Sequence, residues 1–236
     1  MFSRLTIISC FLFFFNALVG QEEVGGFYFG PKLGPTIGTQ NWDGFDRRPM
    51  FNYHAAVFIE SIDPDFKGAF FGQIGYHSRG SSLNFRNFIG NFNSEAFTFR
   101  NISVMMGAKK RLITNTLYTP YYFVGVRGEY QLSNNLQDIQ DRFNSPFFPV
   151  PGFVNKWTYG ISFGGGIEFL GSEFIQPAVE LNVAPDLSFQ YQSVAIQNVI
   201  NPFNGQPTTL PERRIRNITI ELSFVMRFMR RVVYIN

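Results

Sequence analysis

The chain has 236 residues, of which 45% are hydrophobic, 18% are aromatic and only 16% are charged. This composition is too apolar for a disordered chain, and beyond residue 20 no apolar run approaches the roughly 18 residues that a membrane-spanning helix needs. With 20 basic and 17 acidic residues, the net charge of +3 is too balanced to indicate nucleic acid as a partner.

The N-terminal segment has the features of a secretory signal peptide. Arg4 supplies one positive charge, an apolar run extends from Leu5 to Val19, and Gly20 precedes a polar stretch. We therefore expect residues 1–20 to be removed; an uncleaved membrane anchor is the alternative, which the shortness of the run disfavours. The single cysteine, Cys10, lies within this segment, so the mature chain is expected to contain neither a disulfide nor a thiolate metal site.

After residue 25 the chain repeatedly alternates between apolar and polar or small residues. From Phe27 to Ile37 every odd residue is apolar, whereas the residues between them are mostly small or polar. Alternation with a period of two predicts a β-strand with one apolar face. The segments that show this pattern are 27–38, 53–62, 69–79, 97–109, 121–132, 157–169, 174–185 and 214–228.

The length and number of these segments predict a membrane barrel. They run for about 10–15 residues, and roughly 9–11 tilted residues carry a strand across a bilayer. We therefore predict an all-β fold for residues 21–228: an eight-stranded antiparallel transmembrane β-barrel with long extracellular loops, after the cleaved signal peptide. A soluble barrel or sandwich is the alternative, with the apolar faces inside. The aromatic content and the glycine-rich polar faces favour apolar faces that point outward to lipid.

The lengths of the connections predict the orientation in the outer membrane. Barrels of this membrane have short periplasmic turns and long extracellular loops, and an even number of strands leaves both termini on one side. The N- and C-termini are therefore expected in the periplasm, with residues 229–236 as a short C-terminal tail. The long connections are 39–52, 80–96, 133–156 and 186–213, and the short ones are 63–68, 110–120 and 170–173.

Three segments also carry a family resemblance: 70–81, 120–133 and 217–228. They are similar to the third, fifth and closing strands of the PorT-type outer-membrane β-barrel proteins of Gram-negative bacteria. The motif at the end of the third strand differs here, since His77 is inserted and Arg79 stands in place of a lysine. The resemblance covers nearly the whole mature chain and implies a barrel without implying an activity. Some members of this family serve the type IX secretion system or other envelope assemblies.

The polar faces of the predicted strands place charged side chains in the barrel interior. Eight strands enclose a lumen that side chains can fill, and buried charges must pair because isolated ones cost several kcal/mol. We therefore expect a plugged, ion-paired interior in preference to a conducting pore. The charges that strand parity assigns to the lumen are Lys32, Glu60, Arg79, Lys109, Arg127, Glu129, Glu168, Glu180, Glu221 and Arg227.

The two histidines, His54 and His77, are predicted to lie opposite each other. The hairpin between residues 62 and 69 fixes a register that brings them together, facing inward near the extracellular rim. They could form a metal site, a pH-sensitive pair or part of a catalytic group, or they could simply line the mouth of the lumen. A hydrolase would also need a nucleophile and an acid nearby, and Ser78 faces lipid by parity. We therefore predict no catalytic residue, no metal and no cofactor.

These observations favour a protein without enzymatic activity. We expect a structural or accessory subunit of an envelope machine for protein secretion or barrel assembly. Its expected partners are outer-membrane lipid and other envelope proteins. The phenylalanine-rich stretch 143–148 favours a contact surface in the loops. The alternatives are a barrel that transports or binds a small solute and, less favoured, a lipid-modifying enzyme of the outer membrane.

Overall fold

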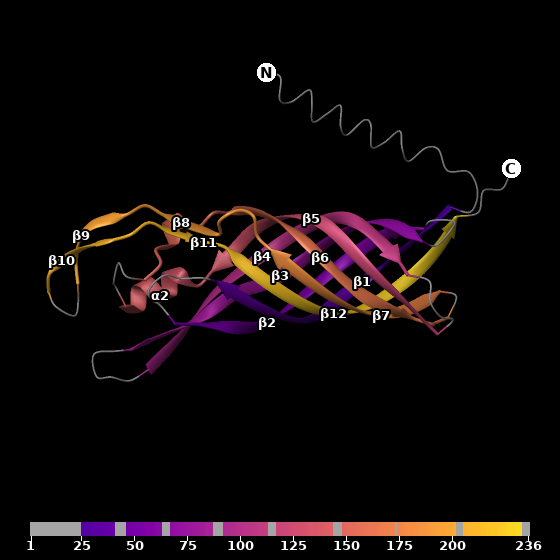
Figure 1. Cartoon of the computed structure of the whole chain (residues 1–236), viewed down its shortest axis with the longest axis horizontal. Helices are drawn as coiled ribbons and strands as arrows, with labels where there is room; N and C mark the ends of the chain where they lie inside the picture. Colours follow the sequence, from indigo (N-terminus) through magenta and orange to yellow (C-terminus); the bar gives the residue numbers. More distant parts are fainter. Residues whose placement is uncertain are drawn as a thin grey trace, which may run out of the picture.

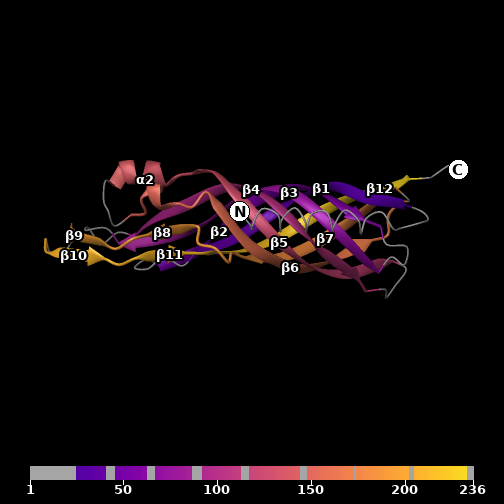
Figure 2. The ribbon, with the colours of Figure 1, turned by 90° about the horizontal axis from the view of Figure 1, so that it is seen from above.

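The computed structural model describes residues 25–40, 46–62, 67–86, 92–112, 117–143, 148–172, 174–201 and 205–232. Within these ranges eight strands close into an antiparallel barrel in the order β1-β12-β7-β6-β5-β4-β3-β2 (Figure 1, Figure 2). The barrel strands are β1 (Gly25–Gln40), β2 (Asp46–Ser61), β3 (Gly68–Arg86), β4 (Phe92–Arg111), β5 (Tyr118–Asn134), β6 (Trp157–Phe169), β7 (Ile175–Pro185) and β12 (Asn217–Val232). All eight predicted strands are confirmed, whereas the predicted signal peptide, residues 1–20, lies outside the described residues.

Side chains alternate along each barrel strand between the interior and the outer surface. In β5, Phe123 and Arg127 are buried, whereas Val124 and Val126 are about 60% exposed. Most apolar residues of these strands therefore face outward, whereas the buried side chains are mainly charged or polar with a few aromatic rings such as Phe123. This arrangement is the reverse of a soluble barrel. The alternation confirms the apolar-out prediction and rules against the soluble alternative.

The uncharged band on the outer surface has the height of a bilayer core. In β4 the outward positions between Arg100 and Lys110 are occupied only by apolar residues. Ten residues of strand extend about 34 Å, and at a tilt of about 35–45° they rise about 24–28 Å. Membrane barrels carry an apolar band about 25 Å tall. The outer surface of β4 therefore matches the hydrocarbon thickness that the fold must cross.

Exposed aromatic side chains lie toward both ends of this band. Those near the short connections are Phe29, Phe70, Tyr118, Phe169 and Phe174. Those toward the long connections are Phe51, Tyr53, Trp157 and Tyr159. The outward positions between them are mainly aliphatic, as at Val57, Val104 and Leu222, with Phe163 and Phe224 as aromatic exceptions. Aromatic rings are favoured at the two membrane interfaces, so this distribution supports a membrane-spanning barrel.

Glycines of β6 make room for aromatic rings inside the barrel. A Cβ atom on Gly164 would come within 2.7 Å of the ring of Phe123, and one on Gly166 within 2.6 Å of the Tyr121 hydroxyl. Both would also lie within 2.5 Å of the carbonyl oxygens of β7. The glycine-rich segment of β6 therefore lets β5, β6 and β7 enclose large side chains in a narrow lumen.

The long connections carry secondary structure that the sequence did not predict. They contain the helix α2 (Leu136–Phe143), the 3-10 turn η1 (Pro151–Phe153), the pair β8 (Tyr191–Ser193) and β11 (Arg213–Ile215), and the hairpin of β9 (Ile196–Ile200) and β10 (Pro207–Leu210). These elements lie at the end of the barrel opposite the end of β12 (Figure 1). No helix of the described residues is long and apolar enough to span a membrane.

A small apolar core orders these loops. Phe97 and Phe99 of β4, Leu136 and Ile139 of α2, and Tyr191 and Ile215 of β8 and β11 are all at most 2% exposed. Phe143 and Phe148 stack at 4.5 Å between ring centroids and pack against this core. These two phenylalanines therefore pack into the loops and are not freely exposed, whereas the rest of the predicted contact stretch, 144–147, lies outside the described residues.

β12 continues beyond the boundary that the sequence predicted. The alternation placed the end of the closing strand at Phe228 and a tail at 229–236, whereas β12 runs to Val232. Met229 and Arg230 pair with the first residues of β1. The prediction ended the strand too early because it took Phe228 as the final aromatic residue of the closing strand, whereas pairing with β1 continues beyond it. Arg230 is exposed at the strand end, where a charge can reach the membrane interface. Residues 233–236 lie outside the described residues.

Deleting residues 229–236 is expected to destabilise the barrel, because residues 25–28 of β1 then lose their partners on β12. Deleting residues 233–236 alone is the control, since it leaves every described pair of β12 intact. The measurement is the fraction of protein with the heat-modifiable gel mobility of a folded barrel. We expect a lower fraction for the longer deletion and no change for the shorter one. Equal folded fractions would show that the end of β12 is dispensable for closure.

Candidate functional site

The barrel interior is filled with ionic side chains from all eight strands. The structure places each of the ten charges assigned by parity inside the barrel, and none is more than 7% exposed. Two further charges in the lumen of the described barrel, Arg111 and Asp186, were missed because the sequence analysis assigned them to connections. Each lies two residues beyond the last inward-facing residue of its predicted strand. The alternation could therefore have identified both.

One cluster lies toward the short connections and centres on Glu60 and Glu168. Glu60 accepts a hydrogen bond from Lys109 Nζ at 3.1 Å and from Arg227 Nη2 at 3.0 Å, and also contacts Arg111. Glu168 lies 2.5 Å from Lys109 Nζ, 3.0 Å from Arg111 Nε and 2.8 Å from Arg227 Nη1. Two carboxylates from β2 and β6 thus bind three cations from β4 and β12 across the lumen.

An ion pair between Lys32 and Glu180 extends this cluster toward the middle of the barrel. Lys32 Nζ lies 2.8 Å from Glu180 Oε1, and the Tyr121 hydroxyl donates to Glu180 Oε2 at 2.9 Å. The aromatic rings of Phe58 and Phe71 lie within 6 Å of the same ammonium group. β1 is therefore tied to β7 through the lumen, and the aromatic rings fill the space around the pair.

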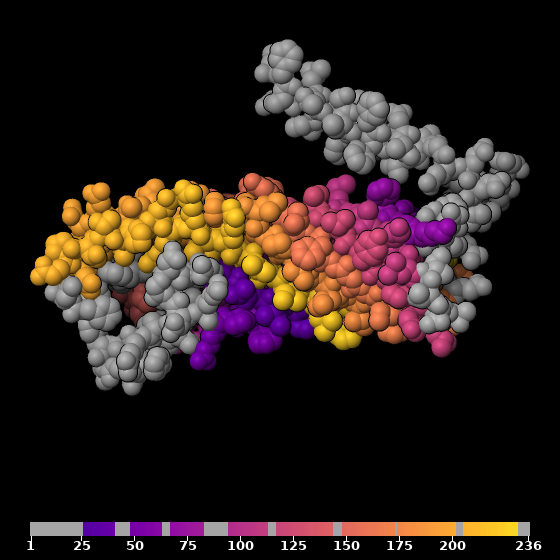
Figure 3. Space-filling model, in the orientation of Figure 1, coloured from indigo at the N-terminus to yellow at the C-terminus, as the bar shows by residue number. Residues whose placement is uncertain are grey.

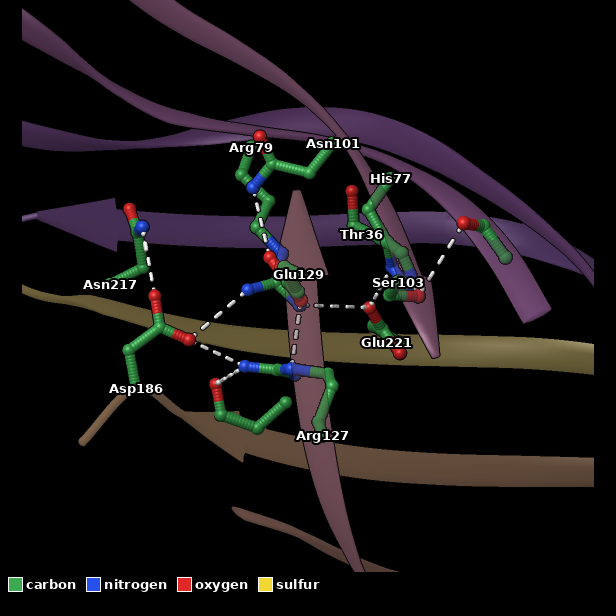
Figure 4. A network of polar contacts seen from close by, with 12 residues as sticks. Thr36, His77, Arg79, Asn101, Ser103, Arg127, Glu129, Asp186, Asn217 and Glu221 are labelled. Carbon is green, nitrogen blue, oxygen red and sulfur yellow. Dashed lines mark hydrogen bonds and ion pairs between the residues drawn. The ribbon is translucent and has the colours of Figure 1, made fainter. Parts of the chain in front are cut away.

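A second cluster lies toward the long loops and joins two arginines to two acids (Figure 4). Arg79 Nη2 and Arg127 Nε each lie 2.7 Å from Glu129 Oε1. The same two guanidinium groups contact Asp186 Oδ1, at 3.3 Å and 2.5 Å respectively. Asn217 donates to the other oxygen of Asp186 at 3.0 Å. The ring of charges links β3, β5, the residue after β7 and β12, and is closed to solvent.

The histidines occupy a different position from the one predicted. His54 and His77 are cross-strand partners, and their rings stack at 5.8 Å with an interplanar angle of 13°. Both are only 2% exposed, and β2 and β3 continue beyond them to Asp46 and Arg86. The pair therefore lies inside the barrel, below the rim. The prediction placed the pair too close to the rim because it began the first strand at residue 53 and ended the second at residue 79.

His77 joins a serine and a glutamate from two other strands. Its Nε2 lies 2.6 Å from Ser103 Oγ on β4, and its Nδ1 lies 2.6 Å from Glu221 Oε1 on β12 (Figure 4). His54 Nε2 similarly lies 2.9 Å from Ser223 Oγ. The order serine, histidine, carboxylate is that of a hydrolytic triad. The sequence analysis did not predict this arrangement, because only closure of the barrel brings β3, β4 and β12 together.

The surroundings of Ser103 leave no entry for a substrate in this structure. Ser103, His77 and Glu221 are 1%, 2% and 2% exposed, respectively. Ser78, which parity placed on the lipid face, is also buried and donates to Asn52 at 3.2 Å. A nucleophile must reach the reacting atom within about 3–3.5 Å, which requires space beside its oxygen. The three side chains therefore act here as a buried polar contact that joins three strands.

A small cavity is present beside the Lys32–Glu180 ion pair. Its volume is about 10 Å³, and its ten lining residues include Lys32, Glu60, Tyr121, Phe123 and Arg227. This is about the space for a single water molecule. Among the described residues, no group of three or more His, Cys, Asp or Glu side chains is placed to hold a metal ion. This cavity has room for a water molecule but not for a solute.

Comparison with known proteins gives the same architecture. A family model described as "Outer membrane protein beta-barrel domain" matches residues 20–194. The outer membrane protein OprG of Pseudomonas aeruginosa has a similar fold, with a TM-score of 0.50, 8% identity, and coverage of 90% of this chain and 98% of that one. Neisserial surface protein A aligns with a TM-score of 0.46 and 9% identity over 88% of this chain and 99% of its own. No curated protein matches this chain.

Proposed function

This chain belongs to the outer membrane protein beta-barrel domain family and lies in the outer membrane, and we propose that it acts there as a non-enzymatic structural or accessory subunit of an envelope machine for protein secretion or barrel assembly. The observation that carries this proposal is the sealed, ion-paired interior. A filled lumen leaves the outer surface and the loops as the surfaces available for function. The resemblance of residues 70–81, 120–133 and 217–228 to PorT-type barrels supports secretion as the setting.

The proposal includes the orientation of the barrel. β1 begins and β12 ends at the same end of the barrel as the short connections (Figure 1). Short turns are periplasmic in outer-membrane barrels, so both termini are assigned to the periplasm and the ordered loops to the cell surface. Partner contacts through the loops are then extracellular, and contacts through the termini are periplasmic.

The arm formed by β9 and β10 supports a loop-mediated contact. It extends beyond the barrel at one end of the molecule (Figure 3). Val194 and Ile200 in this region are 67% and 59% exposed, although they lie outside the apolar band of the barrel strands. A two-stranded sheet also has edges with free backbone groups, which a partner strand can pair with. Exposed apolar residues beside a sheet edge favour a protein partner.

The enclosed triad supports a non-enzymatic assignment. Ser103 is 1% exposed, and the nearby guanidinium group of Arg79 lies 3.9 Å from the carboxylate of Glu221. An acyl-transfer enzyme needs space for the substrate and donors for the oxyanion beside its nucleophile. A lipid-modifying function would therefore require the lumen to open.

The test captures partners of the tagged protein after crosslinking in cells and mild-detergent extraction. The variant carries Val194→Glu and Ile200→Glu, and the matched control carries Gln197→Glu and Thr209→Glu at exposed positions in the same region. We expect specific envelope proteins to be lost from the first and retained by the second. The same purified barrel should show no steady current in planar bilayers. A stable open state, together with no partner that depends on the arm, would favour the solute-transport alternative.

A further inference from the structure

Exposed cations flank the apolar band at the end that carries the long loops. Arg48, Arg100, Lys156, Arg214 and Arg216 are all exposed there. Three of them, Lys156, Arg214 and Arg216, lie on the segments that surround the residues following β7. This side of the barrel therefore combines positive charge with the edge of the lipid-facing surface.

Residues 186–190 are hydrogen-bonded to β6 on one side and to β11 and the start of β12 on the other. Leu187 N donates to Tyr159 O at 3.0 Å on one side, and Gln190 N donates to Ile215 O at 2.8 Å on the other. Asp186 and Gln190 are buried, whereas Leu187 is 49% exposed. The alternation of the wall thus continues above β7, with Leu187 facing outward.

Two of these cations, Arg214 and Arg216, lie against Phe189. The guanidinium group of Arg216 lies 4.3 Å from the centroid of this ring, and that of Arg214 lies 5.7 Å from it. On the other side, the Asn155 side chain donates to the carbonyl oxygen of Phe189 at 2.9 Å, and Lys156 follows Asn155. Both guanidinium groups are within cation–π distance of this ring, which places them side by side. A guanidinium group has five N–H donors, so contact with a ring leaves donors for an anion. Arg214 also contacts Glu212 at 2.6 Å, so one charge of the group is partly balanced.

Apolar residues continue from this point toward the membrane core. Tyr159 is 61% exposed, Leu187 and Ile218 are each 49% exposed, and Ile218 is paired with Pro185 of β7. Trp157, beside Lys156, is 72% exposed. The surface is therefore cationic at the interface and apolar directly below it. A lipid with an anionic head group and long acyl chains has the complementary arrangement.

We propose that Lys156, Arg214 and Arg216 bind the phosphate groups of lipid A, the phosphorylated glycolipid of the outer leaflet, and that its acyl chains lie on Leu187, Tyr159 and Ile218. Guanidinium groups bind phosphate through charge-assisted, often bidentate hydrogen bonds. The assignment to lipid A rests on the proposed orientation, because only the leaflet at the cell surface carries this lipid. A bound lipid would fix the barrel wall at β6 and β12, next to the loop core.

The experiment measures binding of lipid A to the purified, folded barrel in detergent by native mass spectrometry. The variant replaces Lys156, Arg214 and Arg216 with Gln, and the control replaces the exposed Lys67 and Lys110 at the opposite end with Gln. We expect the affinity for lipid A to fall by about tenfold or more in the variant and to stay unchanged in the control. Lipid A without phosphate should bind both proteins equally weakly. Heat-modifiable mobility establishes that each variant is folded.

Three outcomes would overturn the proposal: equal affinity of the triple variant and the parent, equal binding of dephosphorylated lipid A, or competition by inorganic phosphate alone. Equally tight binding of phosphatidylglycerol would show a general anionic-lipid site and overturn the assignment to lipid A. The orientation is tested separately with a protease-sensitive tag after Gln206, which should be cleaved on intact cells, and one after Ser172, which should not. Reversed cleavage would contradict the orientation without affecting the binding measured in detergent.

Discussion

Replacing Glu60 with Gln is expected to lower the free energy of unfolding by about 3–5 kcal/mol, because it removes one partner of a buried ionic cluster. Lys109, Arg111 and Arg227 would then share Glu168 as the carboxylate of the cluster, so positive charge would remain buried without sufficient compensation. None of these three cations can move to solvent, since each is at most 7% exposed. The loss is measured by guanidinium unfolding in micelles, followed by fluorescence and gel mobility.

The control for this experiment is an ion pair outside the lumen, between the loop end of β4 and α2. Glu95 pairs with Arg142 at 2.9 Å, and the Arg142 side chain is 55% exposed. Exposed pairs contribute about 0–1 kcal/mol, so Glu95→Gln should have little effect. A loss below about 1 kcal/mol for Glu60→Gln as well would show that water or rearrangement compensates the interior charges. The closed, ion-paired lumen would then be a poor description of the protein.

Replacing Leu222 with Arg is expected to cost about 2–4 kcal/mol and to prevent accumulation in the outer membrane. Leu222 faces outward on β12, opposite Leu181 of β7, among the aliphatic residues between the aromatic ends. A guanidinium group near the middle of the bilayer has neither water nor a partner within its reach. The measurements are the amount of protein in outer-membrane fractions and the unfolding free energy of the refolded variant in lipid.

The matched control for this substitution is Gln192→Arg. Gln192 is exposed on β8, among the ordered loops and beyond the apolar band. The same change in side chain there should leave accumulation and stability close to those of the parent. Equal behaviour of the two variants would mean that Leu222 does not face the hydrocarbon core, and the apolar band would need a different explanation.

The barrel strands were predictable because their signal is local. Each strand repeats an apolar residue every second position, and this repeat fixes both the strand and the face that its side chains occupy. The same parity located the ten lumen charges, including Arg79 and Glu129, without any knowledge of their partners. The pairing of His54 with His77 followed from one short hairpin, since a hairpin sets the register of its two strands.

The features that the sequence did not reveal depend on contacts between distant segments. Glu221 reaches His77 only because β12 closes the barrel near β3, and nothing close to either residue in the sequence indicates this contact. The elements of the long loops are short, and α2 packs through Leu136 and Ile139 onto β4 and β8. Eight helical residues have too weak a local signal to predict without that core. Arg111 and Asp186 were missed for a simpler reason: both strands were ended one step early.

The pairing of β1 with β12 has a consequence for how the protein reaches its folded state. Gly25 pairs with Val232, so the contact that completes the wall joins residues nearly the whole chain apart. Such non-local contacts make folding slow, because the entropy of a large loop is lost before any favourable interaction forms. The first strand must wait with an unpaired edge until synthesis and export of the last strand are complete, and unpaired edges aggregate. We therefore expect assembly to be post-translational and to depend on periplasmic chaperones that keep the N-terminal strands apart from other chains.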